Sequence, residues 1–527
     1  LINNHTGKGN RTMTRRELKP VNYIAYGLND ILGAGSMAVI SGWILFFYTT
    51  FCGLSAVEAA SIFAIARILD AVASPLIGHI SDGLGNTRLG RRFGRRRVFL
   101  LFSIPLLPSF ALMWVSGQHY LYYLVTYVFF ELIYAAVIIP YETLAAEMTD
   151  DYKKKAKLAG ARILTGQMSA ILAGILPSWI VSSVGGKESA STFLIMGIIF
   201  AALFMVVVFI VWLFTWEREQ TGVSEDALAQ ERKGSVADTF KVLYTNLTST
   251  LKIRAFRLHL GMYLGGYISQ DVFNAVFTYF VVFAIGGTVV IASEMMAVTY
   301  IAQLAAVAVA IPLVMRFGPA PTYRVAISLY IIAIVALVLM YVMSGEFNLL
   351  WLAVGVIIAG LGRGALNYIP WNTYNYMADV DQIVTAQRRE GSFAGVMTFI
   401  RKATQALAVM SVGIILEMGG FISGADAQSD QAISTIVIML AVGPIIVLLL
   451  GFYVSTFFKL SKETHEVLMA EIAHLKTGAT SPTSEQNKHI VEDLSGFKYD
   501  ELWGRNNVGR FSPAATKPGV RDALNDQ

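Results

Sequence analysis

Residues 139–143 read IPYET, and residues 369–373, 230 positions later, read IPWNT. Each copy ends a long apolar run. A polar segment follows each copy, EMTDDYKKKAKLAGAR at 147–162 in one case and MADVDQIVTAQRREG at 377–391 in the other, and another apolar run comes next. The shared order predicts two related halves arranged as parallel repeats.

The composition around these motifs is that of a membrane protein. Of the 527 residues, 55% are hydrophobic and 15% are charged, against about 25% charged residues in an average soluble protein. A helix needs about 20 mostly apolar residues to cross a bilayer. The sequence holds twelve such runs, which we place at 21–51, 56–80, 98–117, 120–148, 158–184, 191–215, 257–285, 289–316, 321–344, 347–378, 390–418 and 431–458. The expected fold is all-α, with twelve transmembrane helices in two six-helix halves.

The basic residues predict the orientation of these helices. Lys and Arg gather in alternate connections: Arg15, Arg16 and Lys19, the six arginines within 88–97, Lys153–Lys157, 218–257, and Arg388 and Arg389. The opposite connections offer little beyond Lys187. Since short basic loops stay in the cytoplasm, we expect an even number of spans and both termini in the cytoplasm, with the chain in a bacterial inner membrane.

Composition also divides the chain into segments. We expect a cytoplasmic N-terminal segment at 1–20, a first half at 21–215, a cytoplasmic linker at 216–256, a second half at 257–458 and a cytoplasmic tail at 459–527. The linker contains GVSEDALAQERKG, which favours a solvated connector. The tail contains TGATSPTSEQNK, which favours a flexible or loosely docked segment.

Several functional classes are excluded. The pI near 9.0 reflects loop residues that topology explains, so we expect no nucleic-acid partner. The single cysteine, Cys52, rules out a disulfide within the chain and a thiolate metal cluster. We find no HExxH, GxSxG or P-loop motif, so a membrane-embedded enzyme is the rival class that we set aside. We expect no catalytic residue, metal or cofactor, and a functional monomer in the lipid bilayer.

Ionisable residues inside the spans are the candidate functional residues, because burying a charge in a bilayer is costly. They are Asp30, Arg67, Asp70, Glu131, Glu142, Arg162, Asp271, Glu294, Arg363, Arg401, Lys402 and Glu417. Arg67, Asp70 and Ser74 share one helical face, which predicts a cation-coupling group. Glu294 and Glu417 are close enough to span ends to reach water.

Three further sets complete the candidates. Glu142 is a candidate hydroxyl acceptor or proton carrier, and Glu131, eleven residues earlier, could share its face. Tyr141 and Trp371 are candidates to stack on a sugar ring. In the loop between spans two and three, Asp82 and the arginines that include Arg91 and Arg92 predict a cytoplasmic gate that caps neighbouring helix ends.

Beyond these patterns, the sequence resembles the major facilitator superfamily, whose loop signature it carries from Gly78 to Asp82 and in the arginines that follow. More narrowly, it resembles the glycoside-pentoside-hexuronide:cation symporters. YGLNDI at 26–31, RILDAVASPLIGHISD at 67–82, and 139–162 carry this resemblance, which covers all the spans. Similarity to the melibiose permease implies that Asp30 and Tyr134 face a sugar and that Asp70 lies in a cation site. It also implies that Arg162 and Lys402 line the cavity.

Departures from that permease shape the expected substrate and ion. Ser74 replaces a second carboxylate and Ala135 replaces a ligand hydroxyl, which favours a proton over sodium because sodium needs several hard oxygens together. Ile138 replaces a galactoside-binding aspartate, and Glu142 replaces a tryptophan. The remaining basic residues favour a uronide or oligouronide. A neutral glycoside or oligosaccharide, and a lipid-handling facilitator of the same fold, remain as alternatives.

Overall fold

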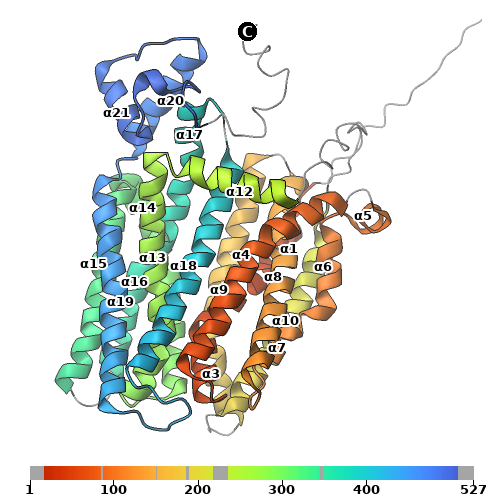
Figure 1. Cartoon of the computed structure of the whole chain (residues 1–527), viewed down its shortest axis with the longest axis vertical. Helices are drawn as coiled ribbons and strands as arrows, with labels where there is room; N and C mark the ends of the chain where they lie inside the picture. Colours follow the sequence, from red (N-terminus) through yellow and green to blue (C-terminus); the bar gives the residue numbers. More distant parts are fainter. Residues whose placement is uncertain are drawn as a thin grey trace, which may run out of the picture.

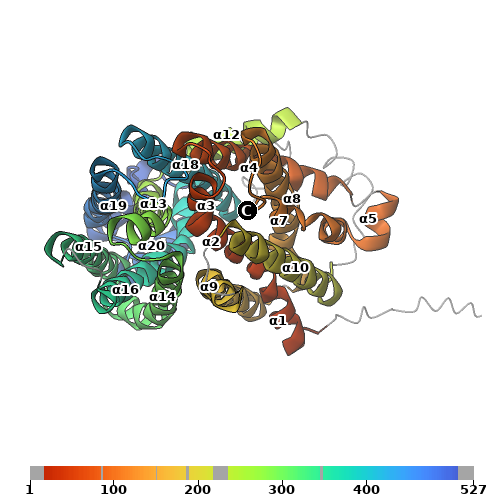
Figure 2. The same cartoon turned by 90° about the horizontal axis from the view of Figure 1, so that it is seen from below.

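The computed structural model describes residues 17–84, 87–149, 151–184, 189–217, 236–344, 348–387 and 389–508. Its described residues form helices and connecting segments, with no β-strand among them. Two groups of helices lie side by side along the long axis (Figure 1). The view from below shows the first-half helices on one side and the second-half helices on the other (Figure 2).

The first half opens with a long, irregular helix. Its parts are α1 (Pro20–Leu28), η1 (Ile31–Gly35), α2 (Ser36–Val39), η2 (Ile40–Ile44) and α3 (Leu45–Thr50), in which η1 and η2 are π-helical turns. The remaining helices are α4 (Ala56–Gly83), α5 (Arg88–Phe93), α6 (Arg97–Ser103), η4 (Ile104–Leu106), α7 (Ser109–Leu112), α8 (Tyr120–Met148), α9 (Tyr152–Val184) and α10 (Ala190–Phe214).

The second half repeats this arrangement with long helices and one π-helical turn, η5. They are α13 (Arg254–Tyr279), η5 (Phe280–Ala284), α14 (Val289–Phe317), α15 (Pro319–Ser344), α16 (Leu349–Tyr374), α17 (Met377–Thr385), α18 (Glu390–Met418) and α19 (Asp430–Phe457). Between the halves lies α12 (Val236–Thr250). We call the end of the molecule with α12 and α17 the linker end, and the opposite end, with α3 and α7, the far end (Figure 1).

The expected membrane helices are largely present, but their count of twelve is not confirmed. Ten helices of the described residues are long and apolar enough to cross a membrane. The run expected at 98–117 is instead divided into α6, η4 and α7, where Pro105 and Pro108 each remove a backbone donor. The run expected at 257–285 forms the helix α13 with η5. It is not among the ten because polar residues, Gln270 and Asp271 among them, lower its hydropathy.

Glycines let helices within and between the halves approach closely. A Cβ at Gly360 would lie 2.4 Å from the carbonyl oxygen of Thr299, and one at Gly364 would lie 2.3 Å from that of Gln303, so α16 and α14 are in backbone contact. Between the halves, α4 packs along α18 and α9 packs along α14. Small residues at such interfaces provide the packing that holds helices together in lipid.

The second part of the linker is a packed helix and not the solvated connector that we expected. Residues 218–235 lie outside the described part of the chain, but residues 236–250 form α12, which lies across the linker end against α4 and α18. The hydroxyl of Ser249 on α12 accepts a hydrogen bond from Arg389 at 3.0 Å, and Arg389 also donates two hydrogen bonds to Asp381 of α17. The linker therefore contacts both halves directly.

The tail was expected to be flexible or loosely docked, but its residues 459–508 fold against the second half. They form α20 (Lys462–Lys476), α21 (Glu485–Ser495) and η6 (Tyr499–Glu501), which lie over the linker end (Figure 1). Leu468, Ile472, Leu475, Val491, Leu494 and Leu502 are buried in this tail domain. Two backbone amides, of Trp503 and Gly504, donate to carbonyls at the end of α17 at 2.8 and 2.9 Å.

A buried carboxylate organises the tail domain. Glu471 accepts hydrogen bonds from the Tyr499 hydroxyl at 2.8 Å and from the Asn487 side chain at 3.3 Å. The backbone amide and the hydroxyl of Thr483 donate to it as well. Burial alone would raise the pKa of Glu471, but these donors outweigh it and hold the pKa below the ordinary value of 4.5. A depressed pKa means that the carboxylate stabilises the domain above pH 4.5 and stops doing so as the pH falls through the folded value.

We therefore expect Glu471→Gln to loosen the tail domain at pH 7. The loss should be about 1–3 kcal/mol of local stability, because an amide cannot accept all of these donors. The difference in stability between the variant and the wild type should shrink as the pH falls below 4.5. Hydrogen exchange of residues 462–508 in the full-length protein measures this local stability. Glu466→Gln, at an exposed position of the same helix, is the control, and equal protection in the two variants would contradict the prediction.

Candidate functional site

Arg67 of α4 lies at the centre of a buried charge cluster. Its Nη1 lies 3.2 Å from the Glu131 carboxylate of α8 and 3.3 Å from the Asp70 carboxylate one turn along α4. The exposed fractions of the three residues are 6%, 1% and 0%. One guanidinium is thus shared by two carboxylates in a region of low dielectric, where removing one partner of a pair is strongly destabilising.

Lys402 completes this cluster from the other half of the molecule. Its Nζ on α18 lies 2.8 Å from Asp70 and 2.7 Å from the Ser74 hydroxyl. Ser74 in turn donates to the Asp70 carboxylate at 3.2 Å. The structure therefore brings together the predicted cation-coupling residues, and it places Lys402 with them instead of beside Asp30 and the other predicted sugar-binding residues.

The cluster continues through α18 to α13. Gln405 accepts two hydrogen bonds from Arg67, at 3.0 and 2.7 Å, and donates one to Asp271 at 3.3 Å. Asp271 forms a bidentate pair with Arg401 at 2.6 and 2.8 Å. We call these seven residues, Arg67, Asp70, Glu131, Asp271, Arg401, Lys402 and Gln405, the inter-half network. It holds three cations and three carboxylates, so its charge is balanced.

The sequence indicated six of the seven network residues as buried charges but did not indicate how they pair. Gln405 was not a candidate because it carries no charge, and Arg401 and Asp271 were recognised as buried charges without a role. The available signal was spacing, since Arg401 and Gln405 are four residues apart and share a face of α18. Their partners on α4 and α13 come from distant parts of the chain.

A second charge cluster lies within the first half. Arg162 of α9 donates to Asp30 at 3.1 Å and to Glu142 of α8 at 2.8 Å. Its guanidinium also lies 5.5 Å from the centre of the Tyr141 ring. We call Arg162, Asp30 and Glu142 the Arg162 cluster. With two carboxylates around one cation, it has a net negative charge when all three are ionised.

The local backbone makes room for Asp30. This residue immediately precedes the π-helical turn η1, and such turns are frequent at functional sites. A Cβ at Gly33 or at Gly166 would lie 2.6 Å from an Asp30 carboxylate oxygen, so a larger residue at either position would displace the Asp30 side chain. The side-chain amide of the neighbouring Asn29 is fully buried and has no hydrogen-bond partner among the described residues.

Of the predicted sugar-binding tyrosines, neither offers a free hydroxyl in this conformation. Tyr141 is fully buried, its ring stacks on Tyr26 with centroids 4.5 Å apart, and its hydroxyl donates to the Tyr26 carbonyl at 2.7 Å. The Tyr134 hydroxyl donates to the Gly33 carbonyl at 3.4 Å. Tyr141 thus positions the Arg162 cluster and presents no open face to a ligand.

The predicted stacking residue of the second half is accessible. Trp371 of α16 is 45% exposed. Its Nε1 donates to the Tyr267 hydroxyl of α13 at 3.0 Å, and its ring meets that of Tyr263 edge to face at 5.9 Å. The Arg401 guanidinium lies 5.0 Å from the centre of the Tyr267 ring. An aromatic group therefore adjoins the inter-half network.

At the linker end, the segment between α4 and α6 is held by Arg95 and Arg96, two of the arginines of the expected gate, and by Glu217, which was not a candidate. Arg95 and Arg96 each pair with Glu147 of α8, at 2.9 and 2.8 Å. The Glu217 carboxylate accepts three hydrogen bonds from backbone amides at 95–97, at 2.9, 2.8 and 2.7 Å. The predicted gate arginines, Arg91 and Arg92, are exposed, and the Asp82 side chain lies outside the described residues.

At the far end, polar contacts join the two halves directly. Thr49 and Tyr279 share a hydrogen bond of 2.6 Å. Glu417 accepts from the backbone amide of Val57 at 2.9 Å, and Glu294 accepts from Ser178 at 2.9 Å. The two glutamates that were expected to reach water are exposed, as expected. They also connect the halves, a role that a position near a span end could not indicate. The far end is closed in this conformation.

Comparisons with known proteins agree on the architecture. The family model described as MFS/sugar transport protein matches residues 25–462. The glucuronide carrier protein homolog of Escherichia coli is 25% identical over 86% of this chain and 95% of its own length. The isoprimeverose transporter of Lactiplantibacillus pentosus is 25% identical over 83% of this chain and 88% of its own. Among solved structures, the nucleoside transporter NupG superposes with a TM-score of 0.55 at 13% identity, covering 84% of this chain and 100% of its own.

Proposed function

The chain belongs to the MFS/sugar transport protein family, and from that premise we propose that it imports an acidic sugar, a uronide or oligouronide, together with a proton. It is a multi-pass membrane transporter and not an enzyme, and the expected kinship with sugar symporters is confirmed by its relatives. The identity of the coupling ion and of the sugar is the proposal.

The observation that carries the coupling is the pairing of Asp70 with Lys402 between the halves. In the proposed cycle, a proton on Asp70 removes the negative charge that holds Lys402, so the inter-half network opens and α4 can move relative to α18. A single carboxylate is sufficient for a proton. Sodium would require several oxygen ligands, and Lys402 already occupies the space beside Asp70 and Ser74.

We assign the linker end to the cytoplasm. The basic connections that the positive-inside tendency places in the cytoplasm adjoin α12 and the loop between α4 and α6 at that end. The far end, which is closed here, is then the extracytoplasmic side, and the membrane is the bacterial inner membrane. Because Asp70 is paired with Lys402 here, this conformation corresponds in the proposed cycle to the state after the proton has left for the cytoplasm.

The proposed sugar follows from charge and from one relative. A relative is named for glucuronides, and glucuronides carry a carboxylate that arginine binds well. Arg162 is already neutralised by two carboxylates, so it favours hydroxyl groups over an anion. A neutral glycoside is therefore the second candidate, and another relative is named for isoprimeverose, a neutral disaccharide.

Uptake into proteoliposomes tests the proposal. Purified protein is given a glucuronide, an unsaturated digalacturonate or a neutral glycoside under an imposed proton or sodium gradient. We expect uronide uptake that the proton gradient drives and a sodium gradient does not. Uptake of neutral glycosides alone would favour the second candidate, sodium-driven uptake would overturn proton coupling, and transport of no sugar would overturn the proposed function.

Trp371 provides a test of sugar contact. We expect Trp371→Ala to raise the KM for the transported sugar about tenfold, since aromatic contacts of this kind are worth about 1–2 kcal/mol. Trp371→Phe should recover most of the affinity because the ring remains. Concentration-dependent uptake measures both variants. Equal KM values in wild type and Trp371→Ala would show that the ring does not contact the sugar.

A further inference from the structure

Away from the span ends, the membrane helices hold equal numbers of basic and acidic side chains. These side chains do not all form ion pairs among the described residues. Apart from Glu294 and Glu417 near the span ends, the ionisable residues inside the spans are five basic side chains and five carboxylates. The basic ones are Arg67, Arg162, Arg363, Arg401 and Lys402, and the carboxylates are Asp30, Asp70, Glu131, Glu142 and Asp271. Four of the cations pair with all five carboxylates. Among the described residues, no carboxylate lies within ion-pair distance of the fifth cation, Arg363.

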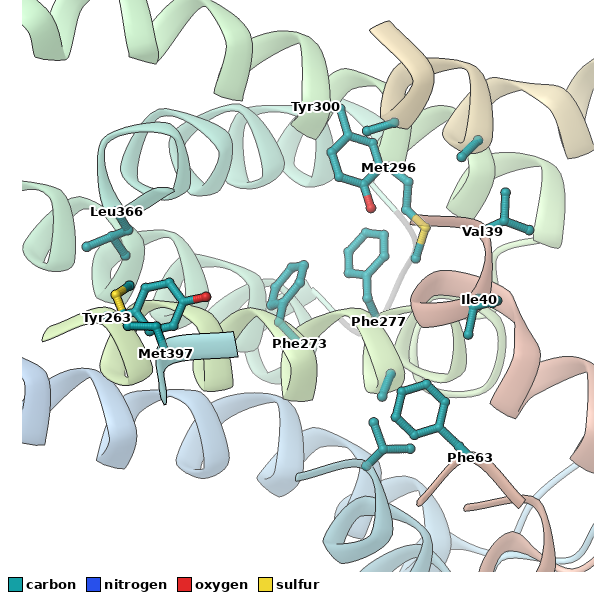
Figure 3. Close-up of a cluster of buried hydrophobic side chains, with 14 of the residues drawn as sticks. Val39, Ile40, Phe63, Tyr263, Phe273, Phe277, Met296, Tyr300, Leu366 and Met397 are labelled. Carbon is teal, nitrogen blue, oxygen red and sulfur yellow. The ribbon is translucent and has the colours of Figure 1, made fainter. Parts of the chain in front are cut away.

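Arg363 is nevertheless deeply buried. It lies near the middle of α16 and is 3% exposed. Its Nε donates to the Gln270 carbonyl oxygen of α13 at 3.2 Å. Its guanidinium lies 5.6 Å from the ring centre of Phe273 and 5.8 Å from that of Tyr300. Figure 3 shows these two rings on adjoining helices, with Phe273 projecting from α13 toward the side on which Tyr300 of α14 lies.

A guanidinium in such a place is expensive unless an anion compensates it. An uncompensated charge inside a membrane protein is strongly destabilising, and an amide oxygen with two aromatic rings offers only partial negative charge. A Leu or Met side chain would pack among Phe273 and Tyr300 without that cost. An anion that is present for part of the transport cycle would compensate this charge.

The surroundings of Arg363 are suited to a small polar ligand. The Gln270 amide is held by two further hydrogen bonds, to the Gly266 carbonyl at 3.0 Å and to Asn367 at 2.9 Å, so its oxygen is aimed at Arg363. On α14, one turn from Tyr300, the buried Oε1 of Gln303 has no hydrogen-bond partner in the described part of the chain. A carbonyl oxygen of this kind is an unused acceptor for a sugar hydroxyl.

We propose that Arg363 binds the carboxylate of the transported sugar, which takes the place of the Gln270 oxygen in the bound state. The inference rests on the proposed function and specifies its substrate. The acidic end of the sugar then lies in the second half, against Arg363, and its hydroxyl groups face the first half, where the Arg162 cluster offers carboxylate acceptors. This arrangement explains how a site with the net negative Arg162 cluster accepts an acidic sugar.

The test compares two substrates that differ only in the carboxylate. These are 4-nitrophenyl β-glucuronide and 4-nitrophenyl β-glucoside, whose binding and uptake are measured with wild type, Arg363→Gln and Gln270→Glu. Arg363→Gln removes the cation. Gln270→Glu keeps Arg363 and gives it a permanent carboxylate partner of the same size, so this variant satisfies the buried charge and should fold.

We expect both variants to weaken glucuronide binding about 30-fold, the range of a charge-assisted hydrogen bond, and to change glucoside binding less than about threefold. Arg363→Lys should retain part of the glucuronide affinity. Equal losses for both substrates in Gln270→Glu would overturn the proposal and leave Arg363 a structural residue. A wild type that moves glucoside but not glucuronide would overturn it too, whereas a wild type that moves neither refutes the proposed function itself.

Discussion

Replacing Asp70 by asparagine is expected to reduce proton-driven uptake at least about 100-fold, because the amide has the shape of the carboxylate but cannot carry the proton. Asp70 is fully buried between Arg67 and Lys402. In the variant, Lys402 has lost its carboxylate partner, while Arg67 keeps its pair with Glu131. The inter-half network is thus fixed in one charge state, and the gradient no longer changes it.

Sugar exchange separates coupling from binding in this variant. Counterflow, in which labelled and unlabelled sugar exchange without a gradient, should change less than about tenfold in Asp70→Asn, because the sugar does not contact this residue in the proposed site. Ser74→Ala is the matched control. It removes a hydroxyl that donates to Asp70 but no ionisable group, and it should retain gradient-driven uptake. Full proton-driven uptake by Asp70→Asn would assign the proton to another carboxylate.

The sequence predicted the ends of a helix well where polar residues flank an apolar run on both sides. The runs expected at 120–148 and 390–418 coincide with α8 and α18. The all-helical fold and the kinship with sugar symporters are confirmed. The run at 98–117 was wrong as a continuous span, because hydropathy does not register that Pro105 and Pro108 interrupt the backbone hydrogen bonds.

The site could be predicted only as far as contacts are local. The spacing of Arg67, Asp70 and Ser74 placed them together, because residues three and four apart share a helical face. The pairing of Asp70 with Lys402 joins residues more than 300 positions apart, and no periodicity encodes it. The same holds for Arg363, which appeared in the sequence as one buried charge among twelve. Only the positions of the carboxylates that the structure describes reveal that none of them pairs with Arg363.

A substitution that prevents closure of the far end is expected to have the second large effect on uptake. A Cβ at Gly413 of α18 would lie 2.3 Å from the Ala60 Cβ and 2.5 Å from the Ala56 carbonyl oxygen, both on α4. Since part of that contact is backbone, a side chain at 413 can be accommodated only if the two helices separate. The clash falls between the halves and not within one, so Gly413→Leu should fold but remain open at the far end.

We expect Gly413→Leu to reduce uptake at least about 100-fold, since alternating access requires both ends to close in turn. A single introduced cysteine reports the conformation. In a Cys52→Ser background, which has no other thiol, Thr49→Cys places a thiol where Thr49 is fully buried against Tyr279. This thiol should react with a membrane-impermeant maleimide from the far side many times faster when Gly413→Leu is present.

Gly395→Leu is the control for this experiment, because Gly395 lies on the same helix and a Cβ there meets nothing within 4 Å. It should leave both uptake and the labelling of Thr49→Cys close to the parent values. If Gly413→Leu transports at the parent rate, or if its introduced thiol stays as unreactive as in the parent, then α4 and α18 do not separate at the far end. The halves would then have to move about another line of contact, such as that between α9 and α14.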